Sequence, residues 1–172
     1  ERDVEVLFQS IGEACKHFEI TLTGGHTEIT DAVTRPVAVG TLLGTMKPDR
    51  KVDTSRARPG DAVLLIGGLA IEGTALLAKE FAEDVEVALG SDLQKRAERL
   101  LTDPGLCVWR PALLAVSRYL AHALHDPTEG GLATALWELG AVTGCGIEAD
   151  KNSVVIYPET ETICEHFKID PF

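Results

Sequence analysis

One stretch decides the expected fold of this chain: Leu124-His125-Asp126-Pro127-Thr128-Glu129-Gly130-Gly131-Leu132. A short apolar run ends there, two glycines follow, and the pattern predicts that an amphipathic helix begins after them. A corner between a strand and a helix directs backbone N–H groups and the positive end of the helix dipole toward one spot. The sequence therefore predicts a corner at Asp126–Gly131 that can hold an anion.

The residue types at this corner suit phosphate and magnesium. Gly130 and Gly131 let the backbone approach a bulky anion closely, and Thr128 can cap the helix or donate to a phosphate oxygen. Asp126 can coordinate a hard cation such as magnesium, which prefers carboxylates and phosphates. The same residues also make an ordinary turn and helix cap. Taken alone, the stretch leaves both interpretations open.

A second glycine-rich corner, Thr23-Gly24-Gly25-His26-Thr27-Glu28, lies upstream. Gly24 and Gly25 free the backbone at the end of an expected strand, and His26, Thr27 and Glu28 offer an imidazole, a hydroxyl and a carboxylate. A hairpin turn with exposed polar residues is the alternative. The chain has no serine nucleophile elbow, no Walker-type phosphate loop and no dinucleotide-binding glycine motif. The residues alone therefore predict two anion-holding corners and no identified catalytic residue.

Composition limits the classes of function. The 172 residues are 45% hydrophobic and 25% charged, which is ordinary for a soluble globular protein. A formal net charge of −11 argues against a general nucleic-acid or anionic-membrane surface. No apolar run approaches the ~20 residues that span a bilayer, and no secretory leader is recognised. The four cysteines form no Cys-x-x-Cys pair, so we expect reduced thiols in a cytoplasmic protein.

Apolar periodicity predicts a mixed α/β (α+β) chain. Helices are expected over 4–18, 72–81, 92–101, 111–120 and 132–143, and from Pro158 onward. Strands are expected over 20–23, 36–44, 61–66, 147–149 and 154–156, with an apolar run over 121–124 leading into the first corner. Residues 83–90 are acidic and poorly periodic, which predicts a loop.

A polar, basic segment over residues 47–59 interrupts the pattern and is followed by Gly60. Its composition is typical of a connection between domains. We expect a solvated linker there rather than a ligand-binding segment. The sequence thus predicts one domain in residues 1–46 and another in residues 60–172.

The order and spacing of the motifs resemble one superfamily. It contains aminoimidazole ribonucleotide (AIR) synthetase (PurM), the hydrogenase maturation protein HypE, selenophosphate synthetase and thiamine-monophosphate kinase, and the resemblance is closest to HypE and the AIR synthase-related proteins. The residues that carry it are Thr23–Glu28, Arg35–Thr41, Arg58–Asp61, His125–Ala133 and Glu165–Pro171. The resemblance extends over most of the chain.

This resemblance implies a fold and an activity. Residues 1–46 would be the end of a PurM-type N-terminal domain that binds ATP and dimerises, 47–59 the linker, and 60–172 an AIR synthetase-like C-terminal α/β domain, incomplete at its end. The intact protein would be a homodimeric, ATP- and Mg²⁺-dependent enzyme. It would transfer a phosphoryl group to an amide-like carbonyl oxygen of a small-molecule or protein carboxamide substrate. The alternative is a non-catalytic homologue that acts as a dimerising or partner-binding module in hydrogenase metallocentre maturation.

The resemblance also assigns the site residues. Five would flank the nucleotide phosphates from the first domain: Gly24, Gly25, His26, Thr27 and Glu28. Four would face the same cleft from the second: Asp126, Thr128, Gly130 and Gly131. Glu28 and Asp126 are the candidate metal ligands. The family's aspartate-rich magnesium segment normally lies upstream of residue 1, so the chain looks like a fragment that is inactive alone. Glu129 stands where HypE usually has arginine, which leaves the superfamily branch and the phosphoryl acceptor open.

Overall fold

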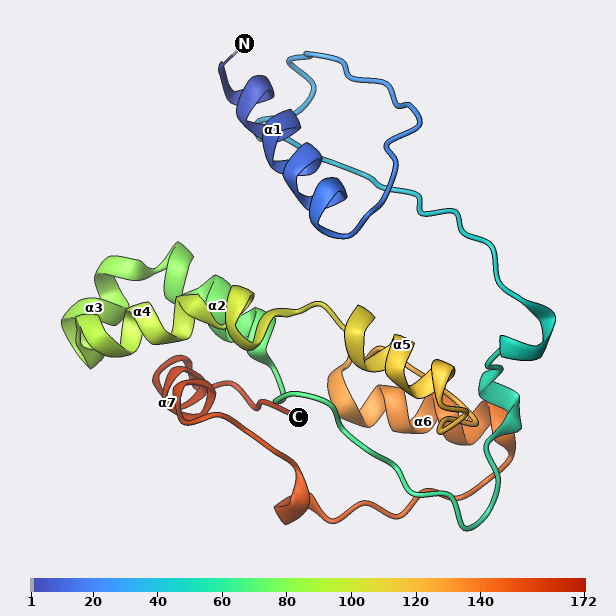
Figure 1. Ribbon diagram of the computed structural model, residues 1–172. Helices are drawn as coiled ribbons and strands as arrows, with labels where there is room; N and C mark the ends of the chain where they lie inside the picture. Colours follow the sequence, from blue (N-terminus) through green and yellow to red (C-terminus); the bar gives the residue numbers. More distant parts are fainter. Residues whose placement is uncertain (1) are drawn as a thin grey trace. The chain divides into compact units, whose positions relative to one another are not determined.

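The computed structural model describes residues 2–172, and helices are its only regular elements (Figure 1). The chain divides into two compact units, Glu1–Gly44 and Thr45–Phe172. Each unit is described by itself. No helix in the described part of the chain is long and apolar enough to cross a membrane.

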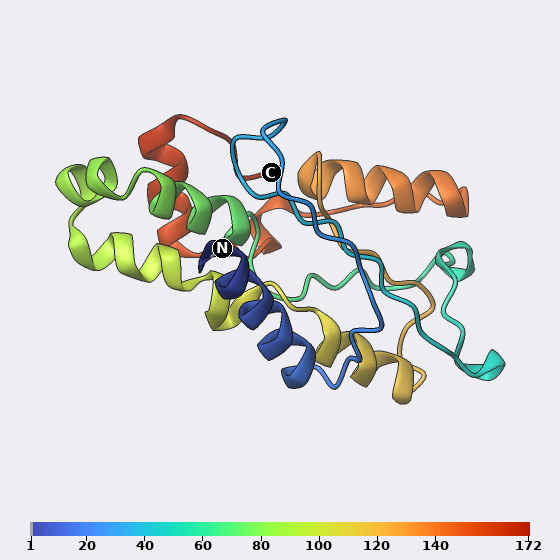
Figure 2. The same ribbon diagram turned by 90° about the horizontal axis from the view of Figure 1, so that it is seen from above.

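Among its described residues, 2–44, the first unit contains one helix, α1 (Arg2–His17). Acidic Asp3 and Glu5 lie in its first turn and basic Lys16 and His17 in its last, which complements the helix dipole at both ends. The helix predicted over 4–18 is thereby confirmed. Residues 18–44 form no helix or strand, and Figure 2 shows them as a long uncoiled stretch.

The second unit holds six α-helices, joined by short turns between α2, α3 and α4 and by longer irregular stretches between the later helices. The helices are α2 (Ile71–Glu80), α3 (Ala82–Leu89), α4 (Ser91–Arg99), α5 (Trp109–Ser117), α6 (Gly131–Thr143) and α7 (Pro158–Phe167). Two 3₁₀ turns, η1 (Pro48–Arg50) and η2 (Thr54–Arg56), precede α2, the irregular turn η3 (Leu101–Gly105) follows α4, and a third 3₁₀ turn, η4 (Lys151–Ser153), lies between α6 and α7.

The core of this unit lies between α2, α3, α4 and α7. Its buried residues are Ala78, Val85, Ala97 and Ile163, with Leu77, Leu89, Leu93 and Phe167 packed around them. Buried polar groups are paired: Thr74 Oγ1 donates to Thr160 Oγ1 at 3.1 Å, and Gln94 Nε2 donates to the Ala78 carbonyl at 3.0 Å. These two bonds join α2 to α7 and α4 to α2.

Most helix predictions for the second unit are confirmed by α2, α4, α6 and α7. The loop predicted over 83–90 is wrong, because these residues form α3. Val85 is fully buried against the neighbouring helices, and this tertiary contact outweighs the weak periodicity of the segment. Gly90 then ends the helix with a φ of +93°. Helix α5 ends at Ser117 rather than at residue 120, and Tyr119 has a left-handed φ of +55°.

The predicted mixed α/β fold is wrong. Among residues 2–172 there is no strand, and the apolar runs over 20–23, 36–44, 61–66, 121–124, 147–149 and 154–156 stay irregular. A strand requires a partner that completes its backbone hydrogen bonds, and these runs meet almost none. One such bond joins Leu69 N–H to the Val155 carbonyl at 3.0 Å. The apolar runs therefore predicted strands, but the ladders of backbone hydrogen bonds that would pair those strands are absent among residues 2–172.

The basic segment 47–59 lies near the N-terminal end of the second unit, and its arginine side chains anchor it there. Arg50 donates to the carbonyls of Val116 and Ser117 at 3.3 and 2.9 Å and stacks over the Tyr119 ring at 4.0 Å. Arg50 thus adds hydrogen bonds to carbonyls at the end of α5, where the Val116 carbonyl also accepts the Tyr119 N–H at 3.3 Å. The segment is held against residues 116–119, while its role as a domain boundary stays a prediction.

Candidate functional site

The Asp126–Gly131 corner is shaped by two glycines in left-handed conformations. Gly130 has φ +81° and Gly131 has φ +63°, and α6 starts at Gly131. The Gly131 N–H donates to the Thr128 carbonyl at 3.2 Å, which closes a tight turn before the helix. Residues with a Cβ rarely adopt this conformation, so the sequence needs glycine at both positions.

Close neighbours also explain the glycines. A Cβ on Gly130 would collide with the Thr134 side chain, and a Cβ on Gly131 would lie 2.5 Å from the Phe172 carbonyl oxygen. The corner is thus packed against the first turn of α6 on one side and against Phe172 on the other. The two glycines allow the close approach of a side chain at Gly130 and of a backbone carbonyl at Gly131, while the approach of an anion stays a prediction.

No side chain caps the start of α6. Thr128, the predicted cap, instead interacts with its neighbour: the backbone N–H of Glu129 and the Thr128 hydroxyl hold the pKa of the Glu129 carboxyl below its usual range. The Gly131 N–H is bonded to the Thr128 carbonyl and the Thr134 N–H to the Gly130 carbonyl, while the N–H groups of Leu132 and Ala133 have no side-chain cap. An uncapped helix start carries a partial positive charge, which favours an anion.

The remaining groups of the corner are open to solvent. Asp126 and Thr128 are exposed, and His125 Nε2 lies 2.7 Å from Glu138 Oε2. The His125–Glu138 contact ties the residue before the corner to the middle of α6. Asp126 itself is left available to a cation or a polar ligand.

The second predicted corner, Gly24–Glu28, lies in the first unit and is exposed. A Cβ on Gly24 or Gly25 would meet no atom within 4 Å, and neither glycine has a left-handed φ. The structure therefore shows no local reason for glycine there, unlike at Gly130 and Gly131. A shared site built from the two corners stays a prediction.

The candidate metal ligands Glu28 and Asp126 would meet only part of a metal ion's coordination. No group of three or more His, Cys, Asp or Glu side chains among residues 2–172 could hold a metal ion. Each corner supplies one predicted carboxylate ligand, Glu28 or Asp126. Magnesium commonly binds through one or two carboxylates, with water and substrate phosphates completing its coordination. The residues present thus fit a magnesium–phosphate ligand better than a metal bound by protein alone.

The sequence did not indicate that His122, four residues before Asp126, contacts two charged residues from a distant part of the chain. His122 Nε2 lies 2.8 Å from Arg58 Nη2, and His122 Nδ1 lies 2.8 Å from Asp61 Oδ2. Asp61 also accepts the backbone N–H of Arg58 at 3.0 Å. The Arg58-Pro59-Gly60-Asp61 motif was visible in the sequence, but its contact with residue 122 was not. We call Arg58, Asp61 and His122 the His122 cluster.

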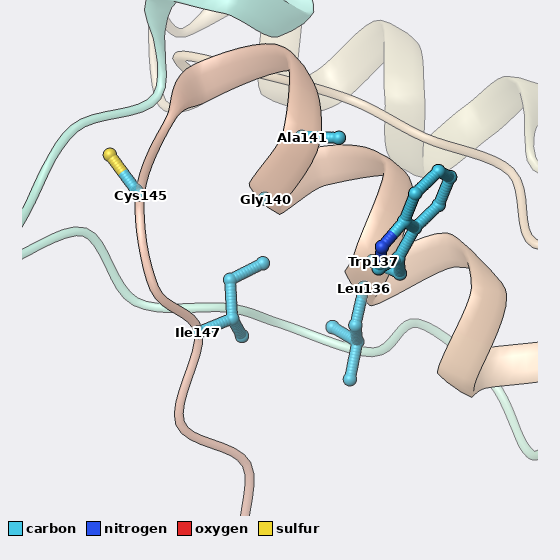
Figure 3. A pocket seen from close by; sticks show the side chains of 6 residues that line it. All are labelled: Leu136, Trp137, Gly140, Ala141, Cys145 and Ile147. Atoms are coloured by element: carbon cyan, nitrogen blue, oxygen red, sulfur yellow. The ribbon is translucent and has the colours of Figure 1, made fainter.

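An apolar hollow of ≈ 360 Å³ lies beside the C-terminal half of α6 (Figure 3). Leu136, Trp137, Gly140 and Ala141 line it from the helix, and Cys145 and Ile147 line it from the segment that follows. It brings no carboxylate or imidazole together, and none of the predicted site residues borders it. The hollow is therefore separate from the chemistry expected at the corner.

Comparison with known families decides how this chain is classified. Residues 58–170 match the model of the AIR synthase related protein, C-terminal domain. The chain belongs to the AIR synthase related protein family. The matched region contains the Asp126–Gly131 corner and the His122 cluster, so both features lie within the AIR synthase related domain.

Curated relatives agree with this classification. A Methanocaldococcus jannaschii protein named for hydrogenase expression and formation is 27% identical over 98% of this chain and 47% of its own length. Carbamoyl dehydratase HypE of Cupriavidus necator is 28% identical over 98% of this chain and 46% of its own. Phosphoribosylformylglycinamidine synthase subunit PurL of a Synechococcus strain is 27% identical over 81% of this chain and 20% of its own. The chain spans about half the length of the first two, and no solved structure matches it.

Proposed function

We propose that this chain is part of an ATP-dependent enzyme that transfers a phosphoryl group to an amide-like carbonyl oxygen. The observation that carries the proposal is the family match over residues 58–170. It is supported by relatives whose names describe a carbamoyl dehydratase and a formylglycinamidine synthase subunit. Both names describe work on nitrogen-bearing carbonyl or amidine groups, and activating such a carbonyl is what phosphoryl transfer from ATP can do.

The Asp126–Gly131 corner is the part of this chain that we assign to phosphate binding. The uncapped first turn of α6 offers backbone N–H groups, and the left-handed Gly130 and Gly131 let an anion approach them closely. Asp126 would contribute to holding magnesium on the phosphates, and Thr128 could donate its hydroxyl. Phosphoryl transfer depends mostly on positioning and charge neutralisation, which such groups can supply.

Gly24, Gly25, His26, Thr27 and Glu28 are proposed to serve the same nucleotide from the first unit, with Glu28 as a second metal ligand. Their exposure leaves these side chains free to meet a ligand. We further propose that the intact protein is a cytoplasmic homodimer acting on a small-molecule or protein carboxamide. The 172-residue chain alone is expected to bind nucleotide weakly and to turn over no ATP, because few ligands are present in it.

The test is magnesium–ATP binding by the intact protein, measured by isothermal titration calorimetry. Asp126→Ala and Glu28→Ala are each expected to weaken binding tenfold or more, because each removes a proposed metal ligand. Asp150→Ala is the matched control: Asp150 also lies in a turn, where it accepts the backbone N–H of Asn152 at 2.9 Å, and it lies outside both corners. This variant should bind as the unchanged protein does.

Two results would overturn the proposal. Equal losses in the Asp150 control and the Asp126 variant would mean that the effect is general rather than local to the corner. Absence of magnesium–ATP binding by the intact protein would instead favour a dimerising or partner-binding module without catalysis.

A further inference from the structure

The His122 cluster joins two segments that are far apart in the sequence. Residues 58–61 open the AIR synthase related domain, and residues 120–125 lead into the Asp126–Gly131 corner. His122 lies between Arg58 and Asp61, at 2.8 Å from a nitrogen of the first and 2.8 Å from an oxygen of the second. The imidazole therefore bridges a cation and an anion on one short stretch of chain.

Chemistry fixes where the proton lies. A guanidinium has donors only and stays charged in proteins, so the His122 nitrogen that faces Arg58 must accept a hydrogen bond. The other ring nitrogen faces the Asp61 carboxylate and must donate to it. The bridge thus requires neutral His122 with its proton on Nδ1. The hydrogen bond from His122, together with the backbone N–H of Arg58, holds the pKa of the Asp61 carboxyl below its usual range.

Two other histidines show why this arrangement is special. His125 pairs with Glu138 at 2.7 Å, and His166 pairs with Asp84 at 2.8 Å. Among the described residues, neither of these two imidazoles has an arginine within hydrogen-bond distance. Protonation strengthens each of these two pairs, because it sets a full positive charge against a carboxylate. Protonation of His122 strengthens its contact with Asp61 but turns an N–H toward the Arg58 guanidinium.

We propose that the His122 cluster is a proton-sensitive connection: neutral His122 joins Arg58 to Asp61, and protonated His122 releases Arg58. The charged side chains that bond to His122 are Arg58 and Asp61. Arg58 favours the neutral imidazole and Asp61 favours the protonated one, so both determine how the connection responds to pH. Acidification breaks the Arg58 side of the bridge and keeps the Asp61 side. The inference concerns the chain's own conformation and does not depend on the proposed enzymatic activity.

The release would act on the stretch that leads to the corner. Arg50 holds the start of the basic segment to the end of α5 through carbonyls that do not titrate. At the end of the same segment, Arg58 bonds to the His122 imidazole, a group that can be protonated. Acid is therefore expected to release the Arg58 side chain, while Asp61, which accepts the Arg58 backbone N–H, stays bonded to His122. Histidine is the side chain whose ordinary charge change falls between pH 5 and 8, so the test covers that range.

The test is an NMR titration of the full 172-residue chain between pH 8 and pH 5. Two-bond ¹⁵N–¹H spectra report which ring nitrogen carries the proton, and backbone amide shifts report the two segments. At pH 8 we expect His122 as the Nδ1–H tautomer, with nuclear Overhauser contacts to the Arg58 side chain. On acidification these contacts should be lost together with His122 protonation, and the amides of residues 58–61 should shift with the same midpoint.

Substitutions separate this device from general acid effects. His122→Gln and Arg58→Ala should each remove the pH-dependent shift of the 58–61 amides. His166→Gln is the matched control: it removes another histidine–carboxylate pair and should leave that shift intact.

An Nε2–H tautomer at pH 8, or Arg58 contacts that survive protonation, would overturn the proposal. The unsubstituted chain alone gives both results, so the proposal can be judged even if a variant fails to fold.

Discussion

At the scale of single residues, Gly131 is a strongly constrained position of the candidate site. It combines a left-handed φ of +63° with the Phe172 carbonyl close to where a Cβ would lie. The double glycine was recognised in the sequence as a corner that admits close approach. The identity of the approaching group, a backbone carbonyl from the far end of the chain, could not be predicted because it arises from a tertiary contact.

Gly131→Ala is expected to lower the free energy of unfolding by about 1–3 kcal/mol, through the left-handed backbone and the clash with Phe172. Urea unfolding followed by circular dichroism measures the change. Gly73→Ala is the matched control within α2, where a Cβ meets no atom within 4 Å and φ is not left-handed. That change should stabilise by roughly 0.5–1 kcal/mol. Equal effects of the two substitutions would contradict the described corner.

Asp53 gives a prediction about pH. The Ser55 hydroxyl, the Lys51 ammonium and the Ser55 backbone N–H together lower the pKa of Asp53 to about 2. Because the folded pKa is depressed, the stabilising contribution of this carboxylate is fully present above its ordinary pKa of about 3.9 and is lost as pH falls through about 2.

Ser55→Ala is expected to raise the pKa of Asp53, since it removes the largest cause. Carboxyl ¹³C shifts measured against pH give the midpoint. Ser153→Ala, which removes a serine from a similar turn, should leave Asp53 unchanged. A midpoint that stays near 2 in Ser55→Ala would show that the hydroxyl is not the main cause.

At the scale of elements, helices were predicted well and strands were not. An amphipathic helix completes its own backbone hydrogen bonds, so the periodicity of residues 4–18 and 132–143 was sufficient to place α1 and α6 closely. A strand depends on a partner elsewhere, and the apolar run over 36–44 does not reveal whether one is met. Helix α3 was missed because its formation also depends on distant residues: Val85 is buried by packing against other helices.

The packing of α7 gives a prediction at this scale. Ile163 is fully buried in the core between α2, α3, α4 and α7. Ile163→Ala is expected to cost about 2–5 kcal/mol, because it removes buried methyl groups and leaves a cavity. Thermal and urea unfolding both report this loss. Val87→Ala, at an α3 side chain that is 84% exposed, should change stability by less than about 0.5 kcal/mol. Comparable losses would mean that α7 is not central to the core.

At the scale of the whole molecule, the candidate site was predicted only in part. The Asp126–Gly131 corner was located from its own residues, because its turn and helix start are local features. The His122 cluster was not, since Arg58 and His122 are far apart in the sequence. The predicted meeting of the two glycine-rich corners depends on tertiary arrangement as well and stays a prediction.

The exposed apolar run over residues 36–44 gives a prediction for the molecule as a whole. Val39 is 92% exposed and Leu43 is 89% exposed, which is unusual for two large apolar side chains within one short apolar run. Replacing both with lysine should raise the solubility of the chain and reduce its binding of a hydrophobic dye. The helical circular dichroism should not change. A loss of helix signal would show instead that these side chains pack against other parts of the molecule.

The anchored basic segment has a consequence for ionic strength. Arg50 bonds to the carbonyls at the end of α5, Arg56 to the Lys51 carbonyl at 3.3 Å, and Arg58 to His122. The guanidinium groups of the most cationic stretch are therefore engaged within the chain. A phosphate at the start of α6 would be held by dipolar amides, which gather no counterion atmosphere that binding must displace. Added salt should weaken such an anion complex far less than it weakens one built on free arginine and lysine.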